Sequence, residues 1–189
     1  MHNDHVLSLD IGASYTKIAL RKGFSGGVRK SVCSFFMEDN REVLIPSIAI
    51  RTNREETPWI FGLDAALTKP DVDMKVYNNW KEHLYDSEPT ANTARAFHIL
   101  GEFLSWLRAQ LIKSGVKVHK VTVRVAVPAL NNANRTAQII AELMELKGWG
   151  SPKILKATEP HANAIGLMSK GKNILHINTD SLRKIEFST

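Results

Sequence analysis

The stretch from Leu7 to Leu20, LSLDIGASYTKIAL, decides the fold of this chain. Two β-prone runs flank a short gap, so we predict strands over residues 6–10 and 15–20 that pair as a hairpin. The first run ends in an acid, Asp10, and Gly12 follows two residues later. A carboxylate at a strand end, followed by a glycine that lets backbone N–H groups approach closely, suits a phosphate site. The alternative is a plain hairpin in which Asp and Gly only form the turn.

Length and composition place the chain among ordinary globular proteins. Its 189 residues are 43% hydrophobic and 23% charged, which suffices for a core and fits one domain or one lobe of a larger one. No apolar run approaches a membrane span, and residues 1–5 lack the layout of a signal peptide. The single cysteine, Cys33, excludes an internal disulfide. We therefore expect a soluble cytoplasmic protein with no membrane partner.

The positive charge of the chain is dispersed. The formal net charge is +6, but the densest basic stretch, residues 113–120, has no interleaved aromatic residues. Nucleic-acid binding needs a basic stripe or patch, so we expect no nucleic-acid partner. The seven histidines show no metal-ligand spacing, and we treat all of them as non-ligands.

The rest of the chain predicts a mixed sheet. Residues 28–36 form a plausible third strand, and residues 43–50 a strand interrupted by Pro46. Residues 37–90 read as an insertion, with a small helix over 63–69. Beyond it, helices over 91–114, from Asn131 or Asn132 to 147, and over 158–168 alternate with strands over 118–127, 153–155 and 173–177, the last with a possible partner over 183–187. A meander followed by such alternation predicts antiparallel and then parallel pairing.

Two further stretches extend the interpretation of the opening hairpin. These are VTVRVAVPALNNANRTA, residues 121–137, and KATEPHANAIGL, residues 156–167. In order and rough spacing, the three stretches resemble the nucleotide-binding domain of the 70-kDa heat-shock chaperone family, within the actin-like ATPase superfamily. The resemblance implies an α/β, ribonuclease H-like lobe: a mixed five-stranded sheet flanked by helices, with an inserted α+β subdomain. No Walker loop is present.

The resemblance also implies site residues and cofactors. Asp10 matches the family's first phosphate loop as catalytic residue and Mg²⁺ ligand, and ATP or ADP would be bound by the residues that follow it: Gly12, Ala13, Ser14, Tyr15 and Thr16. Glu159 matches a catalytic glutamate that organises the metal and its waters; alternatively it is only an acid favoured at a helix N-terminus. Lys81 matches a catalytic lysine that reaches toward the γ-phosphate; alternatively it is a solvated surface lysine.

The second half of the superfamily pattern is incomplete in this chain. We expect residues 1–177 to form the N-terminal lobe, and residues 178–189 the start of a truncated second lobe. Asn178 and Asp180 stand where the second phosphate loop would have an acid and a glycine. The resemblance implies an ATPase reaction, whereas the loss of this acid predicts that the chain alone is inactive in hydrolysis.

Three functions remain open from the sequence. The first is a heat-shock-chaperone-like ATP-binding lobe, and the second is a non-enzymatic pseudo-ATPase that acts as an interaction or scaffold module. The third is an actin-like filament subunit. The expected partners are a nucleotide and either a second chain that completes the lobe pair or a homo-oligomer.

Overall fold

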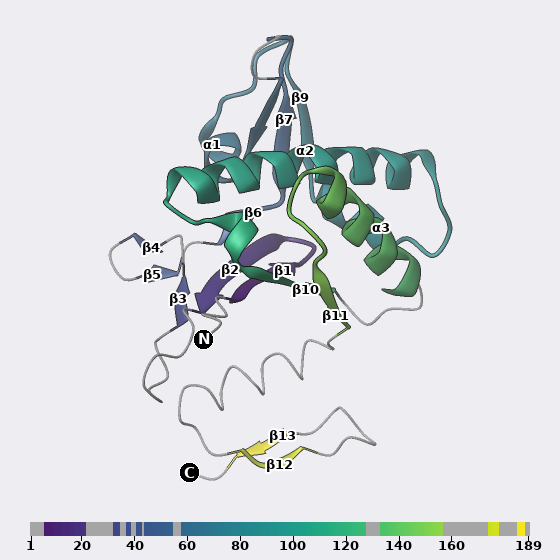
Figure 1. The fold of residues 1–189 in the computed structure, drawn as a ribbon. Helices are drawn as coiled ribbons and strands as arrows, with labels where there is room; N and C mark the ends of the chain where they lie inside the picture. Colours follow the sequence, from purple (N-terminus) through teal and green to yellow (C-terminus); the bar gives the residue numbers. More distant parts are fainter. Residues whose placement is uncertain are drawn as a thin grey trace.

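The structure is a computed structural model that describes residues 6–21, 32–34, 37–38, 41–42, 44–54, 58–127, 133–156, 174–177 and 185–187. Its centre is a mixed sheet in the order β11-β10-β1-β2-β3, with the short strand β6 paired to β2 (Figure 1). The bounds of these strands are β1 Val6–Ile11, β2 Tyr15–Arg21, β3 Val32–Ser34, β6 Ile45–Pro46, β10 Thr122–Val127 and β11 Lys153–Lys156.

Strand directions follow the prediction. The pairs β1–β2 and β2–β3 are antiparallel, whereas β1–β10 and β10–β11 are parallel. The β1–β2 ladder runs from Val6 opposite Arg21 to Ile11 opposite Thr16. The expected five strands are all present in the sheet, and β6 adds a sixth that the sequence prediction had merged with its neighbour.

Alternation of side chains explains why β1 and β10 lie at the centre. In β1, Leu7, Leu9 and Ile11 are buried on one face, while Ser8 is exposed and Asp10 is partly exposed on the other. β10 repeats this pattern, with its three buried valines facing the same core. Period-two burial of this kind orients the whole strand, because a slip of one residue would expose its apolar set.

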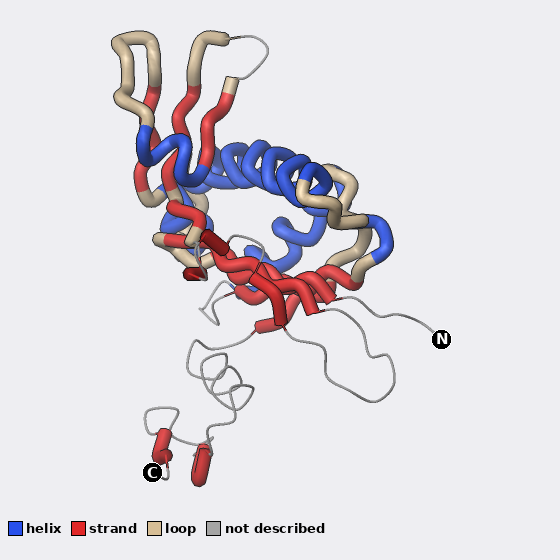
Figure 2. Tube along the Cα trace, turned by 90° about the vertical axis from the view of Figure 1, so that its left-hand side faces the viewer, coloured by secondary structure: helices blue, strands red, loops and turns tan. Residues whose placement is uncertain are grey.

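Two long helices pack on the apolar face of this sheet (Figures 1 and 2). They are α2, Ala91–Lys113, and α3, Ala133–Leu146. The predicted stripe of α2 is confirmed: Phe97 is partly buried, and the other members are fully buried, namely Leu100, Leu104, Leu107 and Leu111. α2 ends where Gly115 takes a positive φ of 83°, as a helix stop requires. The fold is therefore a sheet with its described helices on one face.

A smaller sheet projects from this frame at the top of Figure 1. It has the order β8-β7-β9 and comprises β7 Ile48–Arg51, β8 Trp59–Phe61 and β9 Lys75–Asn78. The short helix α1, Gly62–Leu67, follows β8, and the 3-10 helix η1, Trp80–Tyr85, follows β9. Stacked and edge-on rings of Trp59, Phe61 and Phe103 join this sheet to α2.

Some predicted boundaries were wrong. The run 118–127 begins as a 3-10 turn, η2 Val118–Lys120, before β10 starts at Thr122. Within the predicted strand 28–36, the structure describes β3 at Val32–Ser34.

The remaining described strands are β4 Met37–Glu38, β5 Arg41–Glu42, β12 Ile174–Ile177 and β13 Ile185–Phe187. The predicted helix 158–168 lies outside the described residues.

Candidate functional site

The acid of the opening motif lies at the end of β1, next to the turn. The Asp10 side chain is 48% exposed, and one of its carboxylate oxygens is 3.9 Å from the Nζ of Lys17, its cross-strand partner. At this exposure the pair contributes little to stability, because water screens it. Asp10 therefore remains accessible to a ligand on the face of the sheet opposite the core.

The turn itself needs its glycine. A Cβ at Gly12 would lie 3.0 Å from the backbone oxygen of Tyr15, tighter than nine in ten real Cβ contacts, so the turn would have to shift to accept a side chain. Gly12 and Ala13 are partly exposed and Ser14 is exposed, so their backbone can be reached from solvent. Tyr15 and Thr16, which the sequence placed in the turn, begin strand β2 instead. The accessible turn is thus limited to Gly12, Ala13 and Ser14.

Lys81 lies directly beneath this turn. Its side chain is fully buried, and its Nζ donates a hydrogen bond to the Thr16 hydroxyl at 2.5 Å. The alternative that Lys81 is a solvated surface residue is therefore wrong. The reason is η1, which turns the lysine inward between the sheet and α2. Thr16 lies opposite Ile11 on the core face, so Lys81 and Asp10 approach the hairpin from opposite faces.

The surroundings of Lys81 disfavour its charge. Burial lowers the pKa of Lys81 to about 7, and the Asp10 carboxylate opposes this shift. The Nζ lies 4.9 Å from the ring centre of Phe103 and 5.4 Å from that of Trp80, where the ring faces attract a cation weakly. A neutral hydroxyl and two rings do not replace the hydration of an ammonium group. Near neutral pH, Lys81 is accordingly able to gain or lose its proton.

Two further contacts hold the ends of the turn. The Tyr85 hydroxyl donates to the Ile11 carbonyl at 2.8 Å, and the Ser47 N–H donates to the Ser14 carbonyl at 2.8 Å. Burial, together with Asp10, raises the pKa of the Tyr85 phenol, so this group stays a donor. In a planar trans peptide the N–H points away from the carbonyl. Fixing the Ile11 carbonyl toward Tyr85 therefore directs the Gly12 N–H away from η1.

Sequence reasoning missed Tyr85 and Ser47. Neither belongs to a recognisable motif, and both act through contacts that only the fold creates. One signal was available for η1: residues three apart share a face of a 3-10 helix, which places Lys81 and Leu84 together. Both of these side chains are buried.

A turn with a single carboxylate is suited to hydrated Mg²⁺ rather than to a metal ion that needs all of its ligands from protein side chains. Within the described residues, no group of three or more His, Cys, Asp or Glu side chains could hold a metal ion. Mg²⁺ keeps several waters and commonly binds through one or two carboxylates plus phosphate oxygens. The exposed Asp10 beside an accessible turn fits that requirement. Glu159, the other predicted metal-organising acid, lies outside the described residues, as do Asn178 and Asp180.

Comparisons with known proteins bear on the fold. No protein-family model matches the chain, and no curated protein matches its sequence. Among solved structures, a similar fold occurs in a non-polymerising mutant of MamK bound to AMPPNP. The two share 16% sequence identity with a TM-score of 0.53 over 89% of this chain. The chain has the fold of an actin-like ATPase lobe.

The actin-like lobe described here spans 45% of the length of its MamK neighbour. At 16% identity this likeness concerns the fold, and it does not single out the heat-shock branch of the superfamily. None of the helices in the described part of the chain has the length and apolarity that a membrane span needs.

Proposed function

We propose that this chain binds the phosphates of ATP or ADP, with Mg²⁺, at the turn between β1 and β2. The observation that carries this proposal is the buried Lys81 held against Thr16 directly beneath an accessible glycine turn. Burying an ammonium group is costly: the pKa of Lys81 falls to about 7 although the Asp10 carboxylate opposes the shift, and such perturbed groups are common where a side chain serves a ligand. A plain hairpin has no need of a buried cation.

Each residue of the turn has a distinct role in this proposal. Asp10 holds hydrated Mg²⁺, which supplies positive charge between the carboxylate and the phosphates. The accessible N–H groups of Gly12, Ala13 and Ser14 donate to phosphate oxygens, as backbone nests do. Lys81 adds positive charge under the turn once it is protonated. Glu159 joins this set as a proposal that rests on its match to the family motif.

A filament subunit is a second candidate for the use of this nucleotide site. The MamK neighbour is described as a non-polymerising mutant, which implies a parent that assembles. In this chain, α1 and the turn before β9 expose large apolar side chains, namely Leu63, Leu67 and Val72, at 46%, 73% and 98%. Exposed apolar groups of this kind are typical of contact surfaces. The chaperone-like reading of the sequence is the other finer assignment, and Mg-ATP-dependent sedimentation separates the two.

The binding proposal is tested by thermal unfolding with and without Mg-ATP. A ligand at about 100 times its dissociation constant stabilises by roughly 2.7 kcal/mol, and each kcal/mol moves the Tm of a chain this size by about 2 to 4 °C. We expect a clear rise in Tm for the wild type, and its loss in Asp10→Ala. Asp73→Ala, which removes an exposed carboxylate away from the turn, is the matched control.

Two results would contradict the proposal. One is a folded wild-type chain whose Tm does not respond to millimolar Mg-ATP or to Mg-tripolyphosphate. The other is a response that Asp10→Ala leaves intact. Tripolyphosphate belongs in the experiment because the described site offers contacts to phosphates rather than to adenosine.

A further inference from the structure

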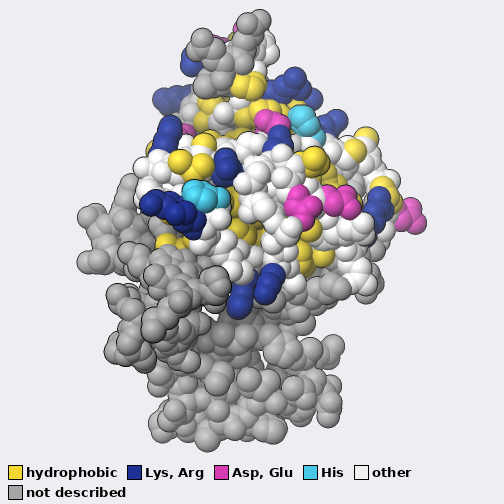
Figure 3. All heavy atoms as spheres, viewed as in Figure 1, with side chains coloured by type: hydrophobic (Ala, Val, Ile, Leu, Met, Phe, Trp, Pro, Cys, Tyr) yellow, Lys and Arg dark blue, Asp and Glu magenta, His cyan; other side chains and the backbone are white. Residues whose placement is uncertain are grey.

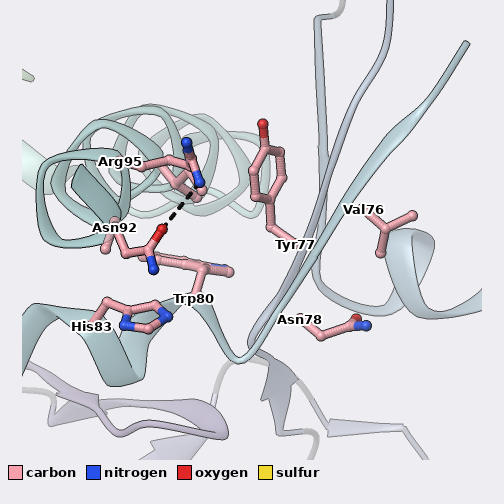
Figure 4. A pocket seen from close by; sticks show the side chains of 9 residues that line it. Val76, Tyr77, Asn78, Trp80, His83, Asn92 and Arg95 are labelled. Carbon is pink, nitrogen blue, oxygen red and sulfur yellow. Dashed lines mark hydrogen bonds between the residues drawn. The ribbon is translucent and has the colours of Figure 1, made fainter. Parts of the chain in front are cut away.

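A cleft lies beside η1, apart from the residues of the phosphate turn. It has a volume of about 210 Å³ and opens between β9, η1 and the first turns of α2 (Figure 4). Nine residues line it, among them Tyr77, Trp80, His83, Asn92, Arg95 and Ile99.

The lining combines flat apolar surface with nitrogen-bearing groups. The rings of Trp80 and Tyr77, with the aliphatic side chain of Ile99, form the apolar part. The Trp80 indole N–H is buried and has no hydrogen-bond acceptor within the described part of the chain. In Figure 4, Asn92, Arg95 and His83 gather around Trp80 on one side of the cleft. This arrangement suits a small ligand with a planar body and a polar end.

The charge of the cleft favours an anion. None of the nine lining residues is acidic, and Arg95 contributes a permanent positive charge. Across the described residues, the polar partner of the Arg95 guanidinium is the Asn92 Oδ1 at 3.2 Å, which leaves its other N–H groups available. Lys75 lies over the Tyr77 ring at 5.6 Å and adds a second cation at the rim. Figure 3 shows Lys and Arg side chains on both sides of the projecting sheet.

His83 is already oriented by an acid. Its Nδ1 is 3.1 Å from a carboxylate oxygen of Asp86, which also accepts a hydrogen bond from the Thr93 hydroxyl. Asp86 is therefore engaged by the side chains of His83 and Thr93. A carboxylate ligand would consequently meet Arg95 as its main charged contact, in the bidentate geometry that guanidinium groups offer.

The geometry of η1 connects this cleft to the phosphate turn. Trp80 and Lys81 are neighbours in η1, and the Lys81 Nζ lies 5.4 Å from the centre of the Trp80 ring. Trp80 and His83 line the cleft, whereas Lys81 and Tyr85 reach the β1–β2 hairpin. This six-residue element thus contributes side chains both to the cleft and to the hairpin that carries the phosphate turn. A ligand that fixes η1 from the cleft would change how Lys81 and Tyr85 meet the turn.

We propose that the cleft between β9, η1 and α2 binds a carboxylate carried on a small flat apolar group, with Arg95 as its charged contact. We further infer that binding there is coupled through η1 to phosphate binding at the turn. The inferred coupling rests on the proposed nucleotide function. The carboxylate can come from a free small acid or from the end of a polypeptide, and the two sources share the same chemistry.

Benzoate is the probe for the cleft, titrated into the nucleotide-free chain labelled with ¹⁵N. The readout is the indole N–H signal of Trp80, assigned with Trp80→Phe. We expect a saturable shift of this signal, and an affinity that falls by about tenfold or more in Arg95→Gln or when neutral benzamide replaces benzoate. The matched control is Arg124→Gln, which removes an exposed arginine of β10 outside the cleft and should change the affinity by less than about twofold.

The source of the carboxylate is resolved by a second titration with acetyl-alanyl-phenylalanine and its C-terminal amide. Tighter binding of this peptide acid than of benzoate assigns the site to a polypeptide end, and its exclusion assigns the site to a free acid. The proposal is overturned if neither acid gives a saturable shift, or if Arg95→Gln binds as the wild type does.

The coupling clause is tested by repeating the benzoate titration with saturating Mg-tripolyphosphate. Coupling is reciprocal, so a change of about fivefold or more in benzoate affinity must appear equally in tripolyphosphate affinity. Equal affinities with and without tripolyphosphate overturn the coupling. A wild type that does not bind tripolyphosphate overturns the proposed function instead, while the benzoate titration still decides the cleft.

Discussion

Lys81 is the residue on which the proposed phosphate site most depends. The sequence left it between a ligand-facing role and a solvated one, because nothing in NNWKEHL fixes which way a lysine points. The structure decides between burial and exposure: η1 directs Trp80, Lys81 and Leu84 into the core, and Thr16 accepts a hydrogen bond from the ammonium group.

Burial of Lys81 makes the stability of the chain depend on pH. The pKa of Lys81 is about 7 in the folded state and near 10.5 in the unfolded state. Between these values the unfolded chain binds more protons, so the free energy of unfolding rises with pH. We expect a gain on the order of 2 kcal/mol between pH 7 and pH 9 in urea unfolding. Lys81→Met should remove this gain, and Lys17→Met, at an exposed site, should keep it. A wild-type profile that is flat or falls over this window would contradict the buried position of the ammonium group.

Tyr85 gives a second prediction at this scale. Tyr85→Phe removes the donor to the Ile11 carbonyl and leaves the ring in place, at a cost of about 1 kcal/mol in stability. If this bond orients the Gly12 N–H, affinity for Mg-tripolyphosphate should also fall by about threefold or more, with a changed Gly12 amide signal. Tyr77→Phe, which removes a hydroxyl outside the turn, should alter neither. An unchanged affinity in Tyr85→Phe would limit the tyrosine to a structural role.

Helix α2 is the element that the sequence predicted best. Its apolar spacing, length and glycine stop all appear as expected, because each depends on residues within one turn of one another. The 3-10 helices η1 and η2 were missed for the opposite reason. They are short, and their existence depends on tertiary partners such as the Leu84 carbonyl, which accepts the Thr136 hydroxyl.

Two glycines, Gly101 within α2 and Gly115 just after its end, should respond in opposite ways to replacement by alanine. Gly101 is helical, and a Cβ there would meet flexible side-chain atoms of Lys147 at 3.4 Å and Leu143 at 3.7 Å. Gly101→Ala should therefore stabilise the chain by up to about 1 kcal/mol through helix propensity. Gly115 has φ near 83° with open space around it, so Gly115→Ala should destabilise by about 1 kcal/mol. Urea unfolding measures the change in the free energy of unfolding for each variant. Equal changes in the two variants would contradict the helical conformation of Gly101 and the positive φ of Gly115.

The architecture of the whole molecule was predictable because several weak signals agreed. A meander, then alternating helices and strands, implied a mixed sheet, and the MamK neighbour confirms an actin-like lobe. The candidate site was predictable only in part. Asp10 and Gly12 are recognisable from the local sequence. In contrast, Tyr85 contacts Ile11, which is 74 residues away in the chain, and Ser47 contacts Ser14, which is 33 residues away. Such pairings leave no local pattern to read.

The central claim is that the β1–β2 turn, with Lys81 beneath it, binds phosphates. The most direct test is the dissociation constant of Mg-ATP and Mg-tripolyphosphate for the wild type, Lys81→Met and Lys17→Met, by calorimetric titration near pH 6.5. Lys81→Met removes a buried charge and should fold well, so a loss of binding reports on the site itself. We predict an affinity reduced about tenfold or more in Lys81→Met, and changed less than about threefold in Lys17→Met. Equal affinities in the wild type and Lys81→Met would contradict the account.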